Sequence, residues 1–123
     1  MTQPARAAAP SLAALQDRLR GIVGPAQVLT GARATRRFAN GFRYGGGPVG
    51  AVVRPGSLVE MWRALNAAVE AGCAVIFQAA NTGLTGGSTP WGAEYGREIV
   101  LISVMHLKGI HLIENGRQVV CLP

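Results

Sequence analysis

The feature of this sequence that most constrains its fold is a strand–helix–strand pattern over residues 51–77. Residues 51–53 are apolar and rich in β-branched side chains, as in a short strand, and Pro55 stops that strand. Residues 74–77 form a second apolar run with the character of a buried strand. Two strands joined by a helix within one sheet are expected to lie parallel, with a right-handed crossover. The pattern therefore predicts a β-α-β unit.

The helix of this unit has a start signal and a stop signal. Ser57 and Glu60 form an S-x-x-E capping box, in which each side chain is expected to satisfy a free backbone amide at the helix start. Gly72 is expected to end the helix. One face is apolar and is expected to pack on the sheet; it consists of Leu58, Met61, Trp62, Leu65, Ala68 and Val69.

A second helix is predicted before the unit. Apolar side chains recur there at helical spacing, in Leu12, Leu15, Leu19 and Ile22. Ser11 is expected to cap this helix, and Gly21, Gly24 and Pro25 are expected to end it. Residues 30–50 show no clear period, so we expect them to be irregular.

Two further strand signals follow the unit. Residues 99–103 are apolar enough for a strand that is buried on both faces. Residues 110–113 and 118–121 flank Asn115-Gly116, which is the strongest short-range signal for a β-hairpin. The predicted fold class is therefore α+β, with a β-α-β unit and a β-hairpin.

The stretch after the second strand, residues 78–90, presents backbone rather than large side chains. It reads QAANTGLTGGSTP, and between residues 79 and 90 it has no charge, no aromatic ring and one large apolar side chain, Leu84. Glycine permits positive φ, and successive turns of that kind point amides inward as an anion-binding nest. Ligands of α/β sheets usually bind at the carboxyl ends of the strands. We therefore expect this glycine-rich loop to bind a phosphate or pyrophosphate.

Two familiar phosphate motifs do not occur here. A P-loop needs a lysine after its glycines, but the chain has one lysine, Lys108. Gly83, Gly86 and Gly87 do not have the G-x-G-x-x-G spacing, and no amphipathic helix follows them, so binding at a helix N-terminus is not expected. If Gly83 or Gly87 adopts positive φ, a β-branched replacement would cost on the order of 1–3 kcal/mol. A surface loop without a ligand remains the alternative.

Charge is the aspect of composition that bears on partners. The net charge is +6, and residues 1–56 hold eight arginines but one acid, Asp17. Arginines interleaved with aromatic residues over residues 33–44 are a pattern that nucleic-acid-binding proteins share. No helix-turn-helix, zinc-finger or stacking motif accompanies it, so nucleic acid is not an expected partner. Weak contact with anionic lipid is expected instead, and no apolar run approaches the roughly 18 residues of a membrane span.

The cysteines and histidines form no metal or redox motif. Cys73 and Cys121 lack C-x-x-C spacing and are expected to be buried thiols. His106 and His111 lie on opposite sides of a loop, at a spacing that no metal motif uses. We therefore expect no metal site, and no ligand or acid–base role for either histidine.

Four blocks of sequence occur in an order typical of one group of flavoproteins. They are GFRYG at residues 41–45, VRPGSL at residues 53–58, the glycine-rich loop at residues 78–90, and VLISVMHL at residues 100–107. In these blocks the chain resembles FAD-linked oxidoreductases of the vanillyl-alcohol-oxidase type. Within that group it is most similar to the respiratory, quinone-dependent D-lactate dehydrogenases of bacteria.

The resemblance implies that the glycine-rich loop binds FAD. The residues that would wrap the pyrophosphate and complete the turn are Ala79, Ala80, Asn81, Thr82, Gly83, Gly87 and Ser88. Neutral amides can satisfy the two phosphates, which carry about two negative charges. The resemblance also places Arg43 near the ligand. Relatives that tether the flavin use a histidine or cysteine near this loop, and residues 74–105 contain neither, so noncovalent FAD is expected.

The same resemblance implies a domain organisation. Residues 11–123 would be the N-terminal part of a PCMH-type FAD-binding domain, after a disordered tail at residues 1–10. The remainder of that domain and a substrate-binding cap domain would follow Pro123, so the chain is expected to be truncated. The catalytic residues would lie mainly in that later part, and none is assigned here.

The implied activity is oxidation of D-lactate to pyruvate, with electrons passing through FAD to a membrane quinone. The partners would be D-lactate and quinone, and the enzyme would lie in the cytoplasm, peripheral on the inner face of the plasma membrane. Two alternatives remain open. In one, the chain would be a truncated remnant without activity. In the other, it would be part of a related flavoprotein that oxidises another 2-hydroxy acid, such as glycolate.

Overall fold

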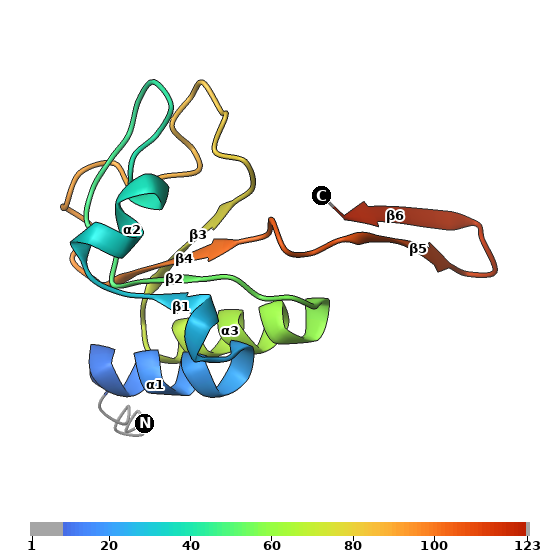
Figure 1. The fold of residues 1–123 in the computed structure, drawn as a ribbon, viewed down its shortest axis with the longest axis horizontal. Helices are drawn as coiled ribbons and strands as arrows, with labels where there is room; N and C mark the ends of the chain where they lie inside the picture. Colours follow the sequence, from blue (N-terminus) through green and yellow to red (C-terminus); the bar gives the residue numbers. More distant parts are fainter. Residues whose placement is uncertain (1–8, 123) are drawn as a thin grey trace, which may run out of the picture.

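A four-stranded sheet forms the centre of the molecule in the computed structural model, which describes residues 9–122 (Figure 1). The strands lie in the order β1 (Val28–Leu29), β2 (Ala51–Val53), β4 (Ile99–Ser103) and β3 (Ala74–Gln78). β4 pairs parallel with both β2 and β3, while β1 pairs antiparallel with β2. The predicted parallel orientation is confirmed, and the third strand lies between the two strands of the β-α-β unit.

Helices cover both faces of this sheet, as Figure 1 shows. Helices α1 (Leu12–Val23) and α3 (Leu58–Glu70) pack on one face, and α2 (Ala32–Ala39) packs on the other. All five residues of β4 are buried, which confirms the prediction of a strand enclosed on both faces. The main core contains residues Leu15, Leu19, Val23, Val28, Ala51, Val53, Ala64, Ala67, Ala68, Val100 and Ile102.

The first helix begins where the sequence predicts and ends at one of the predicted glycines. The Ser11 hydroxyl accepts a hydrogen bond from the Ala14 amide at 3.2 Å. Gly24 has a φ of 90° and donates its amide hydrogen bond to the Arg20 carbonyl, so the helix ends there. The prediction that Gly21 ends the helix is wrong, because Gly21 continues it with no strain at its backbone. Of the expected disordered tail at residues 1–10, residues 1–8 lie outside the described part of the chain.

The cap of α3 differs in one detail from the predicted capping box. The Ser57 hydroxyl accepts from the Glu60 amide at 3.2 Å, as expected. The Glu60 carboxylate accepts from the Gly56 amide at 2.7 Å, one residue before the expected partner. Both bonds still satisfy amides at the start of the helix.

The buried face of α3 is narrower than predicted. Its fully buried side chains are Ala64, Ala67 and Ala68, whereas Trp62 is 62% and Val69 is 59% exposed. The alanines form the part of α3 in the core, and Met61 and Leu65 of the predicted face are partly buried against it. The expectation that Leu58, Trp62 and Val69 pack on the sheet is therefore wrong.

The expectation that residues 30–50 are irregular is also wrong in part. Within that range, residues 32–39 form α2. Before it, the sequence predicted neither the 3₁₀ turn η1 (Pro25–Gln27) nor β1. Thr35, Phe38 and Ala39 are buried at helical spacing, and Phe38 packs with residues of β2 and β4. This one-sided burial stabilises a short helix that arginines otherwise cover.

The predicted hairpin is confirmed and stands apart from the central sheet (Figure 1). Its strands are β5 (Gly109–Ile113) and β6 (Gln118–Leu122), paired antiparallel. Asn115 and Gly116 both have positive φ, at 56° and 85°, as a primed hairpin turn requires. Every residue of β5 is exposed, so this two-stranded sheet has no layer packed on it within the described residues.

One face of the hairpin is apolar and should cause association. Ile110 and Leu112 are 71% and 70% exposed, and Val119 lies opposite Leu112 on the same face. Replacing Ile110 and Leu112 with threonine should weaken self-association about tenfold or more, because one fully buried large aliphatic side chain contributes about 1.5–3 kcal/mol. Sedimentation velocity at several concentrations measures this effect.

The matched control replaces two exposed apolar residues of α3, Val59→Thr with Val69→Thr. That pair should leave the association constant of the chain within about twofold. Equal association of both double variants would show that the hairpin face is not responsible.

Candidate functional site

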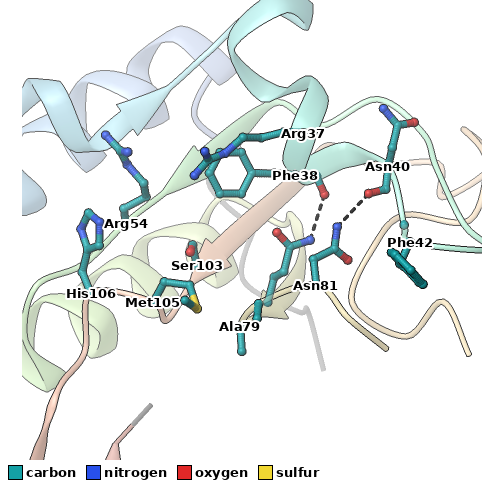
Figure 2. A pocket seen from close by; sticks show the side chains of 13 residues that line it. Arg37, Phe38, Asn40, Phe42, Arg54, Ala79, Asn81, Ser103, Met105 and His106 are labelled. Carbon is teal, nitrogen blue, oxygen red and sulfur yellow. Dashed lines mark hydrogen bonds between the residues drawn. The ribbon is translucent and has the colours of Figure 1, made fainter. Parts of the chain in front are cut away.

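A pocket of about 400 Å³ lies at the carboxyl ends of the three parallel strands (Figure 2). Arg54 directly follows β2, Gln78 ends β3, and Ser103 ends β4. The prediction that the glycine-rich loop leaves the sheet at its ligand-binding edge is thus consistent with the position of the pocket. The lining residues are Arg37, Phe38, Asn40, Gly41, Phe42, Arg54, Gln78, Ala79, Ala80, Asn81, Ser103, Met105 and His106.

The charged side chains of this pocket are all basic. Arg37 and Arg54 line it together with His106, and none of the lining residues is acidic. The Arg37 guanidinium lies 4.6 Å from the centre of the Phe38 ring, a cation–π contact that holds it beside the pocket. Arg54 donates to the Ala26 carbonyl at 2.7 Å, and its Nε is buried without a hydrogen-bond partner. This environment favours an anionic ligand.

Sequence reasoning missed these two arginines. It placed Arg43 near the ligand, but Arg43 does not line the pocket. Arg37 reaches it because α2 forms, and Arg54 reaches it because β2 ends one residue earlier. The position of an arginine directly after a predicted strand was the signal that could have identified Arg54.

The backbone of the glycine-rich loop has free donors. In residues 9–122, no amide from Ala79 to Ser88 donates a hydrogen bond to another residue. Three of the predicted binding residues, Ala79, Ala80 and Asn81, line the pocket. The other four lie outside its lining, farther along the loop, and are Thr82, Gly83, Gly87 and Ser88. The pocket therefore meets the first part of the predicted binding loop.

Two of the predicted binding residues use their side chains to hold the loop. The Asn81 amide nitrogen donates to the Asn40 carbonyl at 2.8 Å, and the Asn81 amide oxygen accepts from the Ser88 hydroxyl at 3.0 Å. Asn81 has a φ of 56°, in the left-handed region that asparagine tolerates better than most residues. The side chains of Asn81 and Ser88 thus join residues within the protein, and the backbone amides of these two residues stay available to a ligand.

The glycine with positive φ in this loop is Gly86, and not Gly83 or Gly87, for which the sequence analysis considered strain. Neither Gly83 nor Gly87 has positive φ, and an added Cβ at Gly83 would meet no atom within 4 Å. Gly86 has a φ of 75°, and a Cβ there would lie 3.4 Å from both the Trp91 ring and the Tyr44 carbonyl. The expectation of backbone strain therefore moves from Gly83 and Gly87 to Gly86.

A second glycine-rich segment, residues 41–47, packs against the end of the loop. The Gly46 amide donates to the Pro90 carbonyl at 2.7 Å, and the Gly92 amide donates to the Gly46 carbonyl at 2.9 Å. Gly45 has a φ of 84°, and a Cβ there would lie 2.4 Å from the Thr89 hydroxyl oxygen. The two segments approach so closely that side chains cannot be added between them.

The remaining titratable groups give no second site among residues 9–122. No three of their histidine, cysteine, aspartate and glutamate side chains lie close enough to hold a metal ion. Burial raises the pKa of the Cys73 thiol, and Glu98 raises it further while Arg97 lowers it. A raised pKa keeps this thiol protonated and unreactive near neutral pH. Among the described helices, none is long and apolar enough to cross a membrane.

The close packing of the two glycine segments gives a test by substitution. Gly45→Ala and Gly92→Ala both place a side chain at positive φ, which costs on the order of 1–3 kcal/mol. Only Gly45→Ala adds an overlap, since the space beside Gly92 is open within 4 Å. We expect Gly45→Ala to unfold in urea with a free energy at least about 1 kcal/mol below that of Gly92→Ala. Equal stabilities would show that the two segments do not pack as described.

Comparison with known proteins shows which proteins this chain is similar to. No family model matches it. Three quinone-dependent D-lactate dehydrogenases are similar to it, with 52% identity for the protein of Corynebacterium glutamicum, 49% for that of Haemophilus influenzae and 46% for that of Escherichia coli. These matches cover 99%, 92% and 89% of this chain but only 21%, 20% and 19% of the relatives. The chain is therefore similar over most of its length to these three enzymes, and it spans about one fifth of the length of each.

Proposed function

We propose that this chain is the FAD-binding portion of a D-lactate:quinone oxidoreductase. The whole enzyme would oxidise D-lactate to pyruvate and pass the electrons through FAD to a membrane quinone. The support is the identity of 46–52% to proteins named quinone-dependent D-lactate dehydrogenase. The mixed α+β fold is compatible with part of a PCMH-type FAD-binding domain, which we infer from the resemblance. The enzyme would lie on the inner face of the plasma membrane.

The observation that carries FAD binding is the run of free amides from Ala79 to Ser88 beside a pocket without acidic groups. Dinucleotide phosphates carry about two negative charges and accept hydrogen bonds from backbone amides in such loops. Arg37 and Arg54 add positive charge at the same edge of the sheet. The residues present thus fit a pyrophosphate, with donors from the loop and attraction from the arginines.

The size of the pocket is consistent with a site that holds only part of FAD. Its volume of about 400 Å³ is in the range of pockets for drug-sized molecules. FAD is larger than such ligands, so part of it would extend beyond the residues described. FAD would supply the redox chemistry, while this chain would bind the phosphates, orient the cofactor and exclude water from one side of it. We assign no catalytic residue within this chain.

Noncovalent attachment of FAD stays a prediction. The range without histidine or cysteine, residues 74–105, includes the whole glycine-rich loop. His106, the next residue, lines the pocket. If a covalent link exists within this chain, His106 is therefore the side chain to examine.

A second candidate is a remnant that binds no cofactor. The observation that favours it is the exposed apolar face of β5 and β6, which no other element of the described residues covers. The two candidates differ in whether the chain binds FAD at the glycine-rich loop.

Titration of the purified chain with FAD, followed by quenching of flavin fluorescence, separates these candidates. We expect a Kd in the micromolar range or weaker, because ordering a large ligand costs about 4 kcal/mol or more and the ring systems have few partners here. Ala80→Glu places a carboxylate at the pocket, beside the proposed phosphate site. This variant should raise the Kd at least about tenfold.

The control is Ala13→Glu, which introduces the same charge at an exposed position of α1. It should change the Kd by less than about twofold, because α1 lies on the face of the sheet opposite α2. Absence of binding by the unchanged chain would favour the remnant. Equal effects of the two substitutions would show that FAD binds elsewhere.

A further inference from the structure

The side chain of Gln78 joins the two ends of the glycine-rich loop. Gln78 is the last residue of β3 and is 2% exposed. Its amide nitrogen donates one hydrogen bond to the Phe38 carbonyl and another to the Ser88 carbonyl, each at 2.9 Å (Figure 2 draws the bond to Phe38). Because the loop starts at Gln78 and returns at Ser88, this side chain links two residues that lie ten positions apart in the sequence.

Two chemical features suit glutamine to this position. A primary amide has two N–H donors on one nitrogen, so one side chain can satisfy two carbonyls. Both carbonyls need such a donor, because Phe38 lies in the last turn of α2, where carbonyls lack partners within the helix, and Ser88 lies outside any strand. An apolar side chain of the same length would leave both carbonyls without this bond.

The contacts of Asn81 reinforce this closure. Asn81 links the loop to the Asn40 carbonyl and also accepts from the Ser88 hydroxyl. Gln78 and Asn81 therefore hold the same two segments, the end of α2 and the return of the loop. The loop is therefore anchored at Gln78, Asn81 and Ser88.

We propose that Gln78 is a positioning residue, which closes the glycine-rich loop onto α2 and so orients the loop amides toward an anionic ligand. This inference rests on the proposed function for its ligand. Gln78 acts through Phe38 and Ser88, whose positions it fixes, rather than through charge or chemistry of its own. Gln78 would therefore affect the affinity for FAD and not the chemical step.

The test compares Gln78→Met with Gln16→Met. Methionine keeps a similar length but has no N–H donor. Gln16 is a matched control, because its amide nitrogen also donates to a carbonyl, that of Gly50 at 2.8 Å, from α1. FAD titration at a temperature far below unfolding measures affinity, and hydrogen exchange measures the opening of the Gly46 and Gly92 amides, which bond the two glycine segments together.

We expect Gln78→Met to raise the Kd for FAD at least about tenfold and to speed exchange at Gly46 and Gly92 by a similar factor. Gln16→Met should leave both quantities within about twofold. Unchanged affinity and exchange in Gln78→Met would overturn the proposal. So would equal changes in the two variants, since they would indicate general destabilisation.

Two further outcomes are covered by the same design. If the unchanged chain binds no FAD, the proposed function fails, while exchange at Gly46 and Gly92 still decides whether Gln78 closes the loop. If Gln78→Met does not fold, Gln78→Asn keeps both donors on a shorter side chain that cannot reach both carbonyls. That variant should bind FAD about three- to tenfold more weakly, and affinity equal to that of the unchanged chain would contradict the proposal.

Discussion

The parallel pairing of β4 with both β2 and β3 is the interaction on which the rest of the structure depends. β4 is buried along its whole length, so it fixes the register of its two neighbours from the centre of the sheet. Parallel pairing brings the carboxyl ends of all three strands to one edge. The basic pocket and the start of the glycine-rich loop lie at that edge because the strands end there.

Much of this arrangement was predictable from local patterns. All strands except β1, together with α1, α3 and the Asn115-Gly116 hairpin, follow from period, caps and turn chemistry. Local patterns did not predict the contacts between segments that are distant in the sequence. α2 depends on the burial of Phe38 against the sheet, and the alanine face of α3 depends on how closely α1 approaches. Such choices are set by tertiary packing, which overrides the preferences of a single segment.

The same distinction applies to the site. Composition and position identified the glycine-rich loop as a candidate for anion binding, and three of its predicted binding residues line the pocket. The role of Gln78 could not be predicted from the sequence, because its hydrogen-bond partners, Phe38 and Ser88, are not its sequence neighbours. Arg37 and Arg54 were missed for the same reason, since each reaches the pocket from another element. The loop supplies donors, and distant residues determine their direction.

The central claim is that the free amides of this loop bind the phosphates of FAD. Amide chemical shifts of the ¹⁵N-labelled chain, followed as FAD is added, test it most directly. The account predicts that the largest shifts fall on the backbone amides from Ala79 to Ser88. Shifts confined to α1, α3 or the hairpin, or no shifts at millimolar FAD, which corresponds to about 4 kcal/mol of affinity, would contradict it.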